Sequence, residues 1–519
     1  MSIAPAFLTL SLPGDDERSQ IDRMVARLSA YGPANLLHES FYEGTFQAAL
    51  YGFSIPPNMA DLGAVAGWGG TVVDVLDERL DWLGWRSDGD AFGLQGVYSE
   101  NQLGVESSMA HLDSLIYGTS FVAVGTGNEG EPSPIVTVQS PWTMTAEWDR
   151  RARRVSQALS VVTEQGRVVE VTRYAPDETT TFAAADGGRW RVVERDQHKL
   201  GRVPIVQMPN RMRASDVSGR SEITPAVRYY TEAAVRTLTG MEVHREFYQA
   251  PQRYAMNVDP DKFVDASGNR VSPWNSIQGR VWAIPPNEDG GPEPSVGQFT
   301  PASPAPYIDQ VKNLATMLAS EAGLPVAYLG YATDNPASAD AIRAGEARLV
   351  KRAERRQTVF GAAWMEVARL ALLVRDGEVP PNFSEVSARW RDPSTPTRAA
   401  AADEAVKLVG AGVLTPDSTV TYDRIGLDPD EQRQMAADKR RALGRSVLDR
   451  IAPTDEASAP QETAAELKAK FEALGAAIRS GVAPEDAARR LGLSGISFTG
   501  ATPVSLRLPE SEAARLEDK

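Results

Sequence analysis

The feature that most constrains the fold is the stretch from Ile223 to Val374, in which helical patterns enclose a Pro/Gly-rich region of strand patterns. Apolar side chains recurring every three or four residues predict a first helix over Ile223–Tyr248. A second helix is predicted over Tyr307–Ala322, where Gly323 is suited to end it, and a long third helix over Ala339–Val374. A chain organised in this way requires several helical parts joined by a small β insertion.

The segments on either side of this stretch differ in their patterns. Residues 16–117 read mainly as amphipathic helices, including one predicted over Val97–Tyr117. From Phe121 to Asn210 the period changes to that of about eight short strands separated by Gly, Pro and Asp turns. After Val374 a strand-like FSEVSARW segment leads back into helices. The sequence therefore predicts an α+β fold in which an antiparallel β region is combined with several helical parts.

Two aromatic and histidine features have a functional and a structural interpretation. Trp82 and Trp85 could form a platform on which bases stack, but they continue the helical stripe of Val72–Leu80, which favours packing in a core. His111 lies in a predicted helix, and we expect it to be packed or capping rather than catalytic.

Composition excludes some classes of function. The 519 residues carry a net charge of −15, which argues against a protein that grips nucleic acid over a broad basic surface. The chain has no cysteine, so disulfides and thiolate metal sites are excluded. The N-terminus has no basic leader and no run of about 20 apolar residues is evident, so we expect neither a signal peptide nor a membrane partner.

No motif in the sequence demands an enzyme. The chain has neither a P-loop for nucleotide phosphates nor a G-x-S-x-G nucleophile turn, and His38-Glu39 lacks the second histidine of a zinc-protease motif. Asp259-Pro-Asp261 has no EF-hand continuation. We therefore expect no cofactor, metal or catalytic residue. A carboxylate-only metal site cannot be recognised by spacing, so a nuclease stays open as an alternative.

Three segments carry a resemblance to a known family. They are SGRSEIT (Ser218–Thr224) before the first helix, LPVAYLG (Leu324–Gly330) after the second, and NPASADAIRAGEARLVKRAERRQTVFGAAW (Asn335–Trp364). Their order resembles the portal proteins of tailed bacteriophages, the siphophage head-to-tail connector family, over about residues 40–450.

The resemblance implies an architecture for the whole chain. Its expected parts are a wing of helices and β region (1–220), a stem helix (221–250), a small α/β clip (251–304), a second stem helix and turn (305–330), a tunnel loop (331–338), a long wing helix with its connector (339–396), and a helical crown with a C-terminal tail (397–519).

The implied function is that of a channel. Portal proteins form a ring, of twelve subunits in the virion, at one capsid vertex, through which double-stranded DNA enters and leaves. The expected partners are further copies of the chain, the terminase large subunit, a head–tail adaptor, scaffold protein and the major capsid protein. Assembly in the host cytoplasm and a final place in the virion follow from the resemblance.

The resemblance also suggests which residues face partners. The tunnel loop, expected to face DNA, contains Thr333, Asp334, Asn335, Pro336, Ala337 and Ser338. Candidates for contacts with DNA or a neighbouring subunit are Arg343, Arg348, Lys351, Arg352, Arg355 and Arg356. Glu346 and Glu354 lie among these cations, so we favour a solvated helix with salt bridges between subunits over direct DNA contact. Clip residues expected to contact partners are Asp261, Trp274, Arg280 and Trp282.

Two further classes are weighed against the portal interpretation. One is a carboxylate-metal nuclease or another minor head protein with a fused activity, which should cleave DNA only with a divalent cation. The other is a helical scaffold protein, which should lack a central channel.

Overall fold

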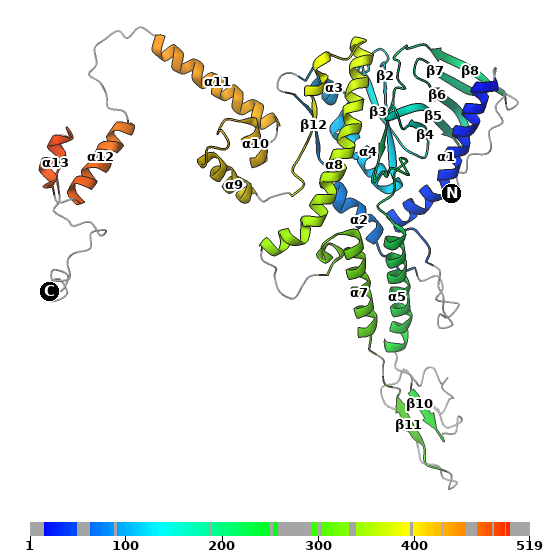
Figure 1. Cartoon of the computed structure of the whole chain (residues 1–519). Helices are drawn as coiled ribbons and strands as arrows, with labels where there is room; N and C mark the ends of the chain where they lie inside the picture. Colours follow the sequence, from blue (N-terminus) through cyan, green and yellow to red (C-terminus); the bar gives the residue numbers. More distant parts are fainter. Residues whose placement is uncertain are drawn as a thin grey trace, which may run out of the picture. The chain divides into compact units, whose positions relative to one another are not determined.

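The structure is a computed structural model that divides into two compact units, Met1–Gly426 and Leu427–Lys519 (Figure 1). It describes residues 15–48, 63–87, 91–185, 189–249, 253–257, 292–298, 300, 303–331, 339–394, 398–427, 429–451, 464–479, 482–493 and 495–498.

The first unit combines helices with small antiparallel sheets. Its helices are α1 (Asp15–Tyr42), α2 (Trp68–Asp77), α3 (Leu94–Glu100), α4 (Leu103–Tyr117), α5 (Pro225–Gln249), α7 (Ala305–Ala322), α8 (Ala339–Asp376), α9 (Arg398–Gly410) and α10 (Thr419–Ile425), with the short 3-10 helices η4 (Val326–Leu329) and η5 (Pro381–Glu385). The predicted α+β class is confirmed.

The predicted antiparallel β region forms two sheets. Their strands are β2 (Thr119–Gly125), β3 (Ile135–Gln139), β4 (Met144–Asp149), β5 (Arg154–Glu164), β6 (Arg167–Tyr174), β7 (Thr179–Ala185), β8 (Arg189–Asp196) and β9 (Ile205–Pro209). The order is β3-β2-β9 in one sheet, and β4 to β8 follow one another as a meander in the other. Meander order is what short turns between antiparallel strands produce.

Alternating side chains explain how the meander is covered. Leu159 and Val161 on β5 and Phe182 on β7 are buried against Ile21 and Met24 of α1. Residues two apart on a strand share a face, so the apolar stripe of α1 has a continuous apolar face to pack on. On Figure 1, α1 lies beside these strands.

The main core is built around α8, which crosses the unit in Figure 1. Trp364 is fully buried, and its ring stacks on Trp82 with centroids 4.1 Å apart. Its indole Nε1 donates to His111 Nε2 at 2.9 Å, while its backbone carbonyl accepts from Trp85 Nε1 at 3.0 Å. The predictions that both tryptophans and His111 are core residues are confirmed.

Local structure near these residues differs from two predictions. Trp82 and Trp85 do not continue a helix but lie on strand β1 (Trp82–Arg86), which pairs with β12 (Ser387–Trp390). The helix predicted over Val97–Tyr117 is broken into α3 and α4 at Gln102, whose φ of 51° is left-handed. Such a residue cannot lie inside a right-handed helix.

One helix bears on the expectation that the chain has no membrane partner. The stretch Ile342–Asp376 contains a window with a mean hydropathy of 1.2, long and apolar enough by composition to span a membrane. Half of that window is buried inside the structure. Phe360, Trp364 and Val367 belong to the main core, so the apolar side chains of α8 are explained by packing within the protein.

Helices α5 and α7 run side by side and carry the β insertion at their far end (Figure 1). The predicted bounds of both helices are close to those observed, and Gly323 ends α7 with a φ of 67°. Strands β10 (Arg253–Met256) and β11 (Ser295–Gln298) pair in antiparallel fashion beyond them. The strand pattern RVWAI (residues 280–284) in the same insertion lies outside the described residues.

The C-terminal helices fall into both units. Helices α9 and α10 belong to the first unit, where Asp423 of α10 pairs with Arg389 of β12 and, at 3.8 Å, with Arg86 of β1. The second unit contains α11 (Pro429–Ile451), α12 (Ala464–Arg479) and α13 (Pro484–Arg490). Leu474 of α12 and Ala487 and Ala488 of α13 form a small core of their own.

Candidate functional site

The segment that leads into α5 carries a buried charge. Thr224 precedes Pro225, the first residue of the helix, and its hydroxyl accepts from the Val227 backbone N–H at 3.3 Å. A threonine cap followed by proline is a favourable helix start, because the cap satisfies a free N–H and proline needs no donor there. This start fixes Glu222, two residues earlier, at the junction of α5 and α8.

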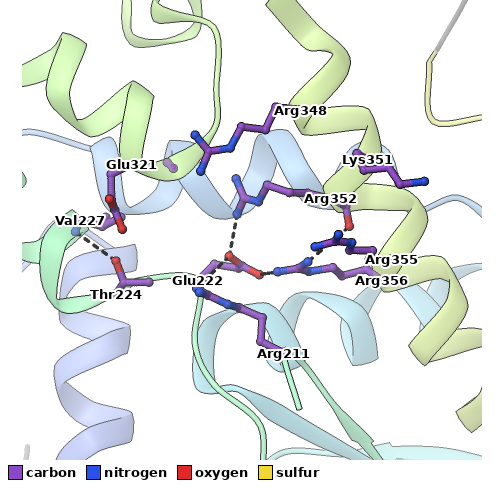
Figure 2. Close-up of a pocket in the computed structure, with 11 residues that line it drawn as sticks. Arg211, Glu222, Thr224, Val227, Glu321, Arg348, Lys351, Arg352, Arg355 and Arg356 are labelled. Carbon is purple, nitrogen blue, oxygen red and sulfur yellow. Dashed lines mark hydrogen bonds and ion pairs between the residues drawn. The ribbon is translucent and has the colours of Figure 1, made fainter. Parts of the chain in front are cut away.

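The Glu222 carboxylate is held by three arginines. Its side chain is 1% exposed, and it accepts from Arg352 Nη2 at 2.6 Å and from Arg356 Nη2. Arg211 Nη1 lies 3.6 Å from the same carboxylate. Arg352 and Arg356 are four residues apart on α8 and so lie on one face of the helix. Figure 2 shows the carboxylate between the two side chains of α8 and Arg211.

The side chain of Asn210 and several backbone contacts hold the Glu222 carboxylate in place. Asn210 Nδ2 donates to Glu222 Oε1 at 3.0 Å, and Asn210 Oδ1 accepts from Arg356 Nε at 3.1 Å. The backbone N–H of Glu222 donates to the Leu115 carbonyl at 2.9 Å. Gly118 and Gly219 lie so close together that a Cβ on Gly219 would be 1.9 Å from the Gly118 carbonyl oxygen. The loop can therefore reach the end of α4 only with glycine at this position.

The electrostatics of the cluster keep Glu222 ionised. Burial by itself raises the pKa of this carboxyl, but the guanidinium groups of Arg356, Arg352 and Arg211 outweigh burial and lower it. A buried charge of this kind is retained only where it is paired and hydrogen-bonded, as Glu222 is. The cluster joins the entry of α5 to the middle of α8.

Next to this cluster lies a cavity of about 380 Å³ at the junction of α5, α7 and α8. It is lined by Arg211, Glu222, Thr224, Val227, Glu321, Ala322, Arg348, Lys351, Arg352, Arg355 and Arg356. Six of these side chains are cationic and two are carboxylates, so the lining carries four positive charges in excess. In Figure 2, Arg348 and Arg352 extend from α8 toward Thr224 and Glu321.

A second polar cluster joins the described residues on either side of 332–338. Arg79 is buried, and its Nη2 donates to the Tyr328 hydroxyl at 3.0 Å and to Glu346 Oε1 at 3.3 Å. The Tyr328 hydroxyl donates to the same Glu346 oxygen at 2.6 Å. Arg79 Nη1 donates to the Pro393 carbonyl at 2.8 Å. Residue 328 belongs to η4 and Glu346 to the first turns of α8, so Arg79 holds both ends of the intervening segment.

The predicted cationic residues of α8 are largely brought together. Arg348, Lys351, Arg352, Arg355 and Arg356 line the cavity, whereas Arg343 is an exposed residue nearer the start of α8. Arg352 and Arg356 pair with Glu222 of the same chain. Contact of these side chains with DNA or a neighbouring subunit stays a prediction.

The other predicted site residues lie outside the described residues. These are the tunnel-loop residues Thr333, Asp334, Asn335, Pro336, Ala337 and Ser338 and the clip residues Asp261, Trp274, Arg280 and Trp282. Their assignments stay predictions.

Sequence reasoning missed the partners of the cationic face. Glu222 lies 130 residues before Arg352, Asn210 lies 146 residues before Arg356, and Arg79 lies 267 residues before Glu346. One local signal existed for Glu222, since it is an acidic residue beside Ile223 and just before a helix start, where apolar neighbours predict burial. No local signal pointed to Arg79.

The described residues contain no group of three or more His, Asp or Glu side chains arranged to hold a metal ion. The chemistry that the side chains of the cavity offer is that of fixed positive charge and guanidinium donors.

Comparison with known proteins identifies the family. Residues 38–444 match the family described as "Phage portal protein, SPP1 Gp6-like". The portal protein of Mycobacterium phage D29 is 34% identical over 470 residues, covering 86% of this chain and 95% of that protein. The portal protein of Mycobacterium phage L5 is 34% identical over 469 residues, with the same coverage.

Solved structures give more distant matches. The chain is similar, at 15% identity and a TM-score of 0.36, to a chain of the neck of a native gene transfer agent (GTA) particle computed with C12 symmetry, covering 75% of this chain and 99% of that one. A chain of the GTA virion matches at 16% identity and a TM-score of 0.38, covering 76% and 99%. From the match to the family and to the two mycobacteriophage proteins, the chain belongs to the phage portal protein family.

Proposed function

We propose that copies of this chain assemble into a ring of twelve subunits at one vertex of a phage capsid, around a channel through which double-stranded DNA is packaged and ejected. The observation that supports this most directly is the pair of helices α5 and α7, which lie side by side and are followed and preceded, respectively, by the antiparallel strands β10 and β11. Together with membership of the portal family, the helix pair fits the stem of a portal subunit, and the strand pair fits its clip.

The remaining parts follow the same assignment. Residues 1–220 form the wing, 221–250 and 305–330 the two stem helices with the turn, 251–304 the clip, 331–338 the tunnel loop, 339–396 the long wing helix and connector, and 397–519 the crown and tail. The Arg79 cluster supports this assignment because it ties both sides of the proposed tunnel loop to the wing.

The mechanism that we propose is geometric. Identical subunits in head-to-tail contact close into a ring when the rotation per subunit divides the circle. A net charge of −15 per chain disfavours tight binding of DNA phosphates, since Lys and Arg contacts supply most non-specific affinity. DNA can then move through the channel without being held. The clip would contact the terminase large subunit and later the head–tail adaptor, while scaffold and major capsid protein would surround the wing during assembly in the host cytoplasm.

The first experiment measures assembly. Multi-angle light scattering of the purified chain should give a mass near that of twelve copies, and negative-stain images should show end-on rings with a central hole. If the chain stays monomeric both alone and when co-expressed with the scaffold and capsid proteins of its phage, the ring proposal is wrong.

A second experiment addresses the tunnel loop. The double variant Asp334→Ala, Asn335→Ala should still form rings of the same mass, because residues of a loop that faces the channel are not expected to hold neighbouring subunits together. We expect it to package less DNA per capsid in an infection complemented with the variant. Full packaging would remove the tunnel-loop assignment, while loss of rings would show a role in assembly instead.

A further inference from the structure

The cavity between α5, α7 and α8 has more cationic donors than the described residues satisfy. Glu222 offers two oxygens to Arg352, Arg356 and Arg211. The second carboxylate of the lining, Glu321, is exposed on the last turn of α7. The lining of this cavity of about 380 Å³ therefore carries four positive charges in excess, one of which is paired with Glu354 outside the lining.

Two of the guanidinium groups are left with free donors. Arg352 is 16% exposed, and its Nη1 is buried without a hydrogen-bond partner among the described residues. Leaving a buried donor unpaired costs free energy, roughly 1–3 kcal/mol and more for a charged group. Arg355, three residues further along α8, lines the same cavity and has no ion-pair or hydrogen-bond partner in the part of the chain that the structure describes.

The other cations of the lining are partly engaged but still reach the cavity. Arg348 Nη1 donates to the Ser320 carbonyl at 2.6 Å, which neutralises none of its charge. Lys351 pairs with Glu354, but both side chains are largely exposed, at 66% and 45%. Exposed ion pairs of this kind contribute little to stability, so either side chain can readily take another partner. The ammonium of Lys351 is therefore available to a ligand.

The arrangement resembles what a phosphate group requires. Several guanidinium forks converge from one face of a helix, and arginine is suited to phosphate because its paired N–H donors match two oxygens at once. A phosphate dianion presents three or four acceptor oxygens and about two negative charges, whereas a carboxylate presents two oxygens and one charge. A dianion therefore satisfies more of the free donors and offsets more of the excess charge than a carboxylate does.

We propose that this cavity is a binding site for a phosphate group, contacted by Arg352 Nη1, Arg355, Lys351 and Arg348, with Glu222 fixing the orientation of Arg352. The group can come from a small phosphate-bearing anion or from a nucleic-acid backbone. This proposal depends on the cavity and not on ring formation. A negative result for ring formation therefore does not contradict the phosphate site, and a negative result for the phosphate site does not contradict ring formation.

The test is calorimetric titration of the full-length protein with sodium phosphate, with sodium chloride at the same ionic strength as the reference. Wild-type protein should bind phosphate with measurable heat and should melt at a higher temperature in phosphate than in chloride. Arg355→Ala should weaken phosphate binding about tenfold or more, the size expected for one charge-assisted hydrogen bond. Lys351→Ala is a second variant at an exposed position and should weaken binding in the same direction.

Arg167→Ala is the matched control, since Arg167 is an exposed arginine at the start of β6, far from the lining residues in the sequence and absent from the cavity. It should bind phosphate as the wild type does. A short DNA duplex added to the phosphate-bound protein distinguishes the two sources. If the duplex displaces phosphate from the wild type but does not bind in this way to Arg355→Ala, the natural ligand is a nucleic-acid backbone. If the duplex does not displace phosphate, the ligand is a small anion. Both outcomes support the site.

Two outcomes would overturn the proposal. The first is no heat and no stabilisation beyond that in chloride. The second is binding that neither Arg355→Ala nor Lys351→Ala weakens, which would place the anion elsewhere.

Discussion

Of the carboxylates that line the cavity, Glu222 neutralises the most positive charge, because it is buried and lies next to three arginine side chains. Replacing it with glutamine keeps its shape but leaves Arg352 and Arg356 as buried cations without a counter-charge. We expect Glu222→Gln to lower the free energy of unfolding by about 3–5 kcal/mol, as breaking a buried ion pair does. Chemical denaturation at pH 7 measures this change.

The pH dependence of the same variant is an independent check. The pKa of Glu222 is lowered from its usual 4.5 in the folded state, so its contribution to stability is present above pH 4.5 and is lost as the pH falls through the folded-state pKa. The difference between wild type and Glu222→Gln should therefore shrink below pH 4.5. Glu321→Gln, at an exposed position of the same cavity, should leave stability nearly unchanged; a large loss there would contradict this account.

Gly118 gives a second prediction at the scale of one residue. Its φ is +97°, and a Cβ there would lie 2.9 Å from backbone atoms of Arg220. We expect Gly118→Ala to destabilise the protein by roughly 3 kcal/mol or more, through backbone strain and displacement of the segment that carries Glu222. Thermal unfolding measures the loss.

The control for this prediction is Gly130→Ala. Gly130 has a similar φ of +91°, but nothing lies within 4 Å of a Cβ at this position. Gly130→Ala should lower the free energy of unfolding by about 1–2 kcal/mol, which is the strain of a left-handed residue alone. Equal losses at the two positions would show that the contact with Arg220 contributes nothing.

At the scale of elements, a histidine joins α8 to α4. His111 is fully buried, stacks on Phe360 with centroids 5.2 Å apart, and accepts from the Trp364 indole. Burial lowers the pKa of His111 to about 3, although a hydrogen bond with the Leu80 backbone acts in the opposite direction. The imidazole is therefore neutral in the folded protein, while the unfolded chain takes up a proton below its usual pKa of 6.5.

We expect stability to fall as the pH drops below 6.5, by about 1.4 kcal/mol per pH unit for this residue. His111→Leu should remove that part of the slope and also lower stability at pH 7, because the Trp364 N–H loses its acceptor. Denaturant titrations between pH 7 and 4.5 measure both effects. Two other groups stay in the variant and shape the remaining slope: His38, whose pKa burial lowers to about 4, adds a slope of the same sign, and Asp77, whose pKa burial raises to about 7, adds one of opposite sign. An unchanged slope in His111→Leu would contradict the assignment.

The same elements show what sequence patterns could and could not provide. The helices α5, α7 and α8 and the strands from β2 to β9 were predictable because their signals are local: apolar periodicity, Gly and Pro at ends, and turn residues. Strand β1 was not, since its pairing with β12 joins residues about 300 positions apart, and Trp82 and Trp85 fit a helical stripe equally well.

For the same reason, only the residues that α8 contributes to the candidate site could be predicted. The cations of α8 are adjacent in the sequence and their helical face follows from spacing, whereas Glu222 and Asn210 approach that face only through the fold. Whether a cationic face is solvated or paired depends on such distant partners. Local charge patterns therefore located the face but could not assign its contacts.

For the molecule as a whole, the boundary between the two units lies at Gly426. Gly426 ends α10 with a φ of 82°, and its N–H donates to the carbonyls of Asp423 and Tyr422. Helix α10 is held to the first unit through the pair of Asp423 with Arg389. Among the described residues, the core of α12 and α13 consists of side chains of the second unit. Each unit thus has its own packing.

This division predicts that a chain ending at Gly426 folds by itself. Its unfolding transition should keep the midpoint of the corresponding transition in the full-length protein, because neither the core around Trp364 nor the Glu222 cluster uses residues after Gly426. A chain ending at Gly410 is the contrasting variant: it removes α10 and its pair with Arg389, and should melt at a lower temperature. Thermal unfolding followed by near-ultraviolet circular dichroism reports on the buried tryptophans in both. If truncation at Gly426 lowers the midpoint as much as truncation at Gly410, the two units share stabilising contacts and the chain behaves as one cooperative body.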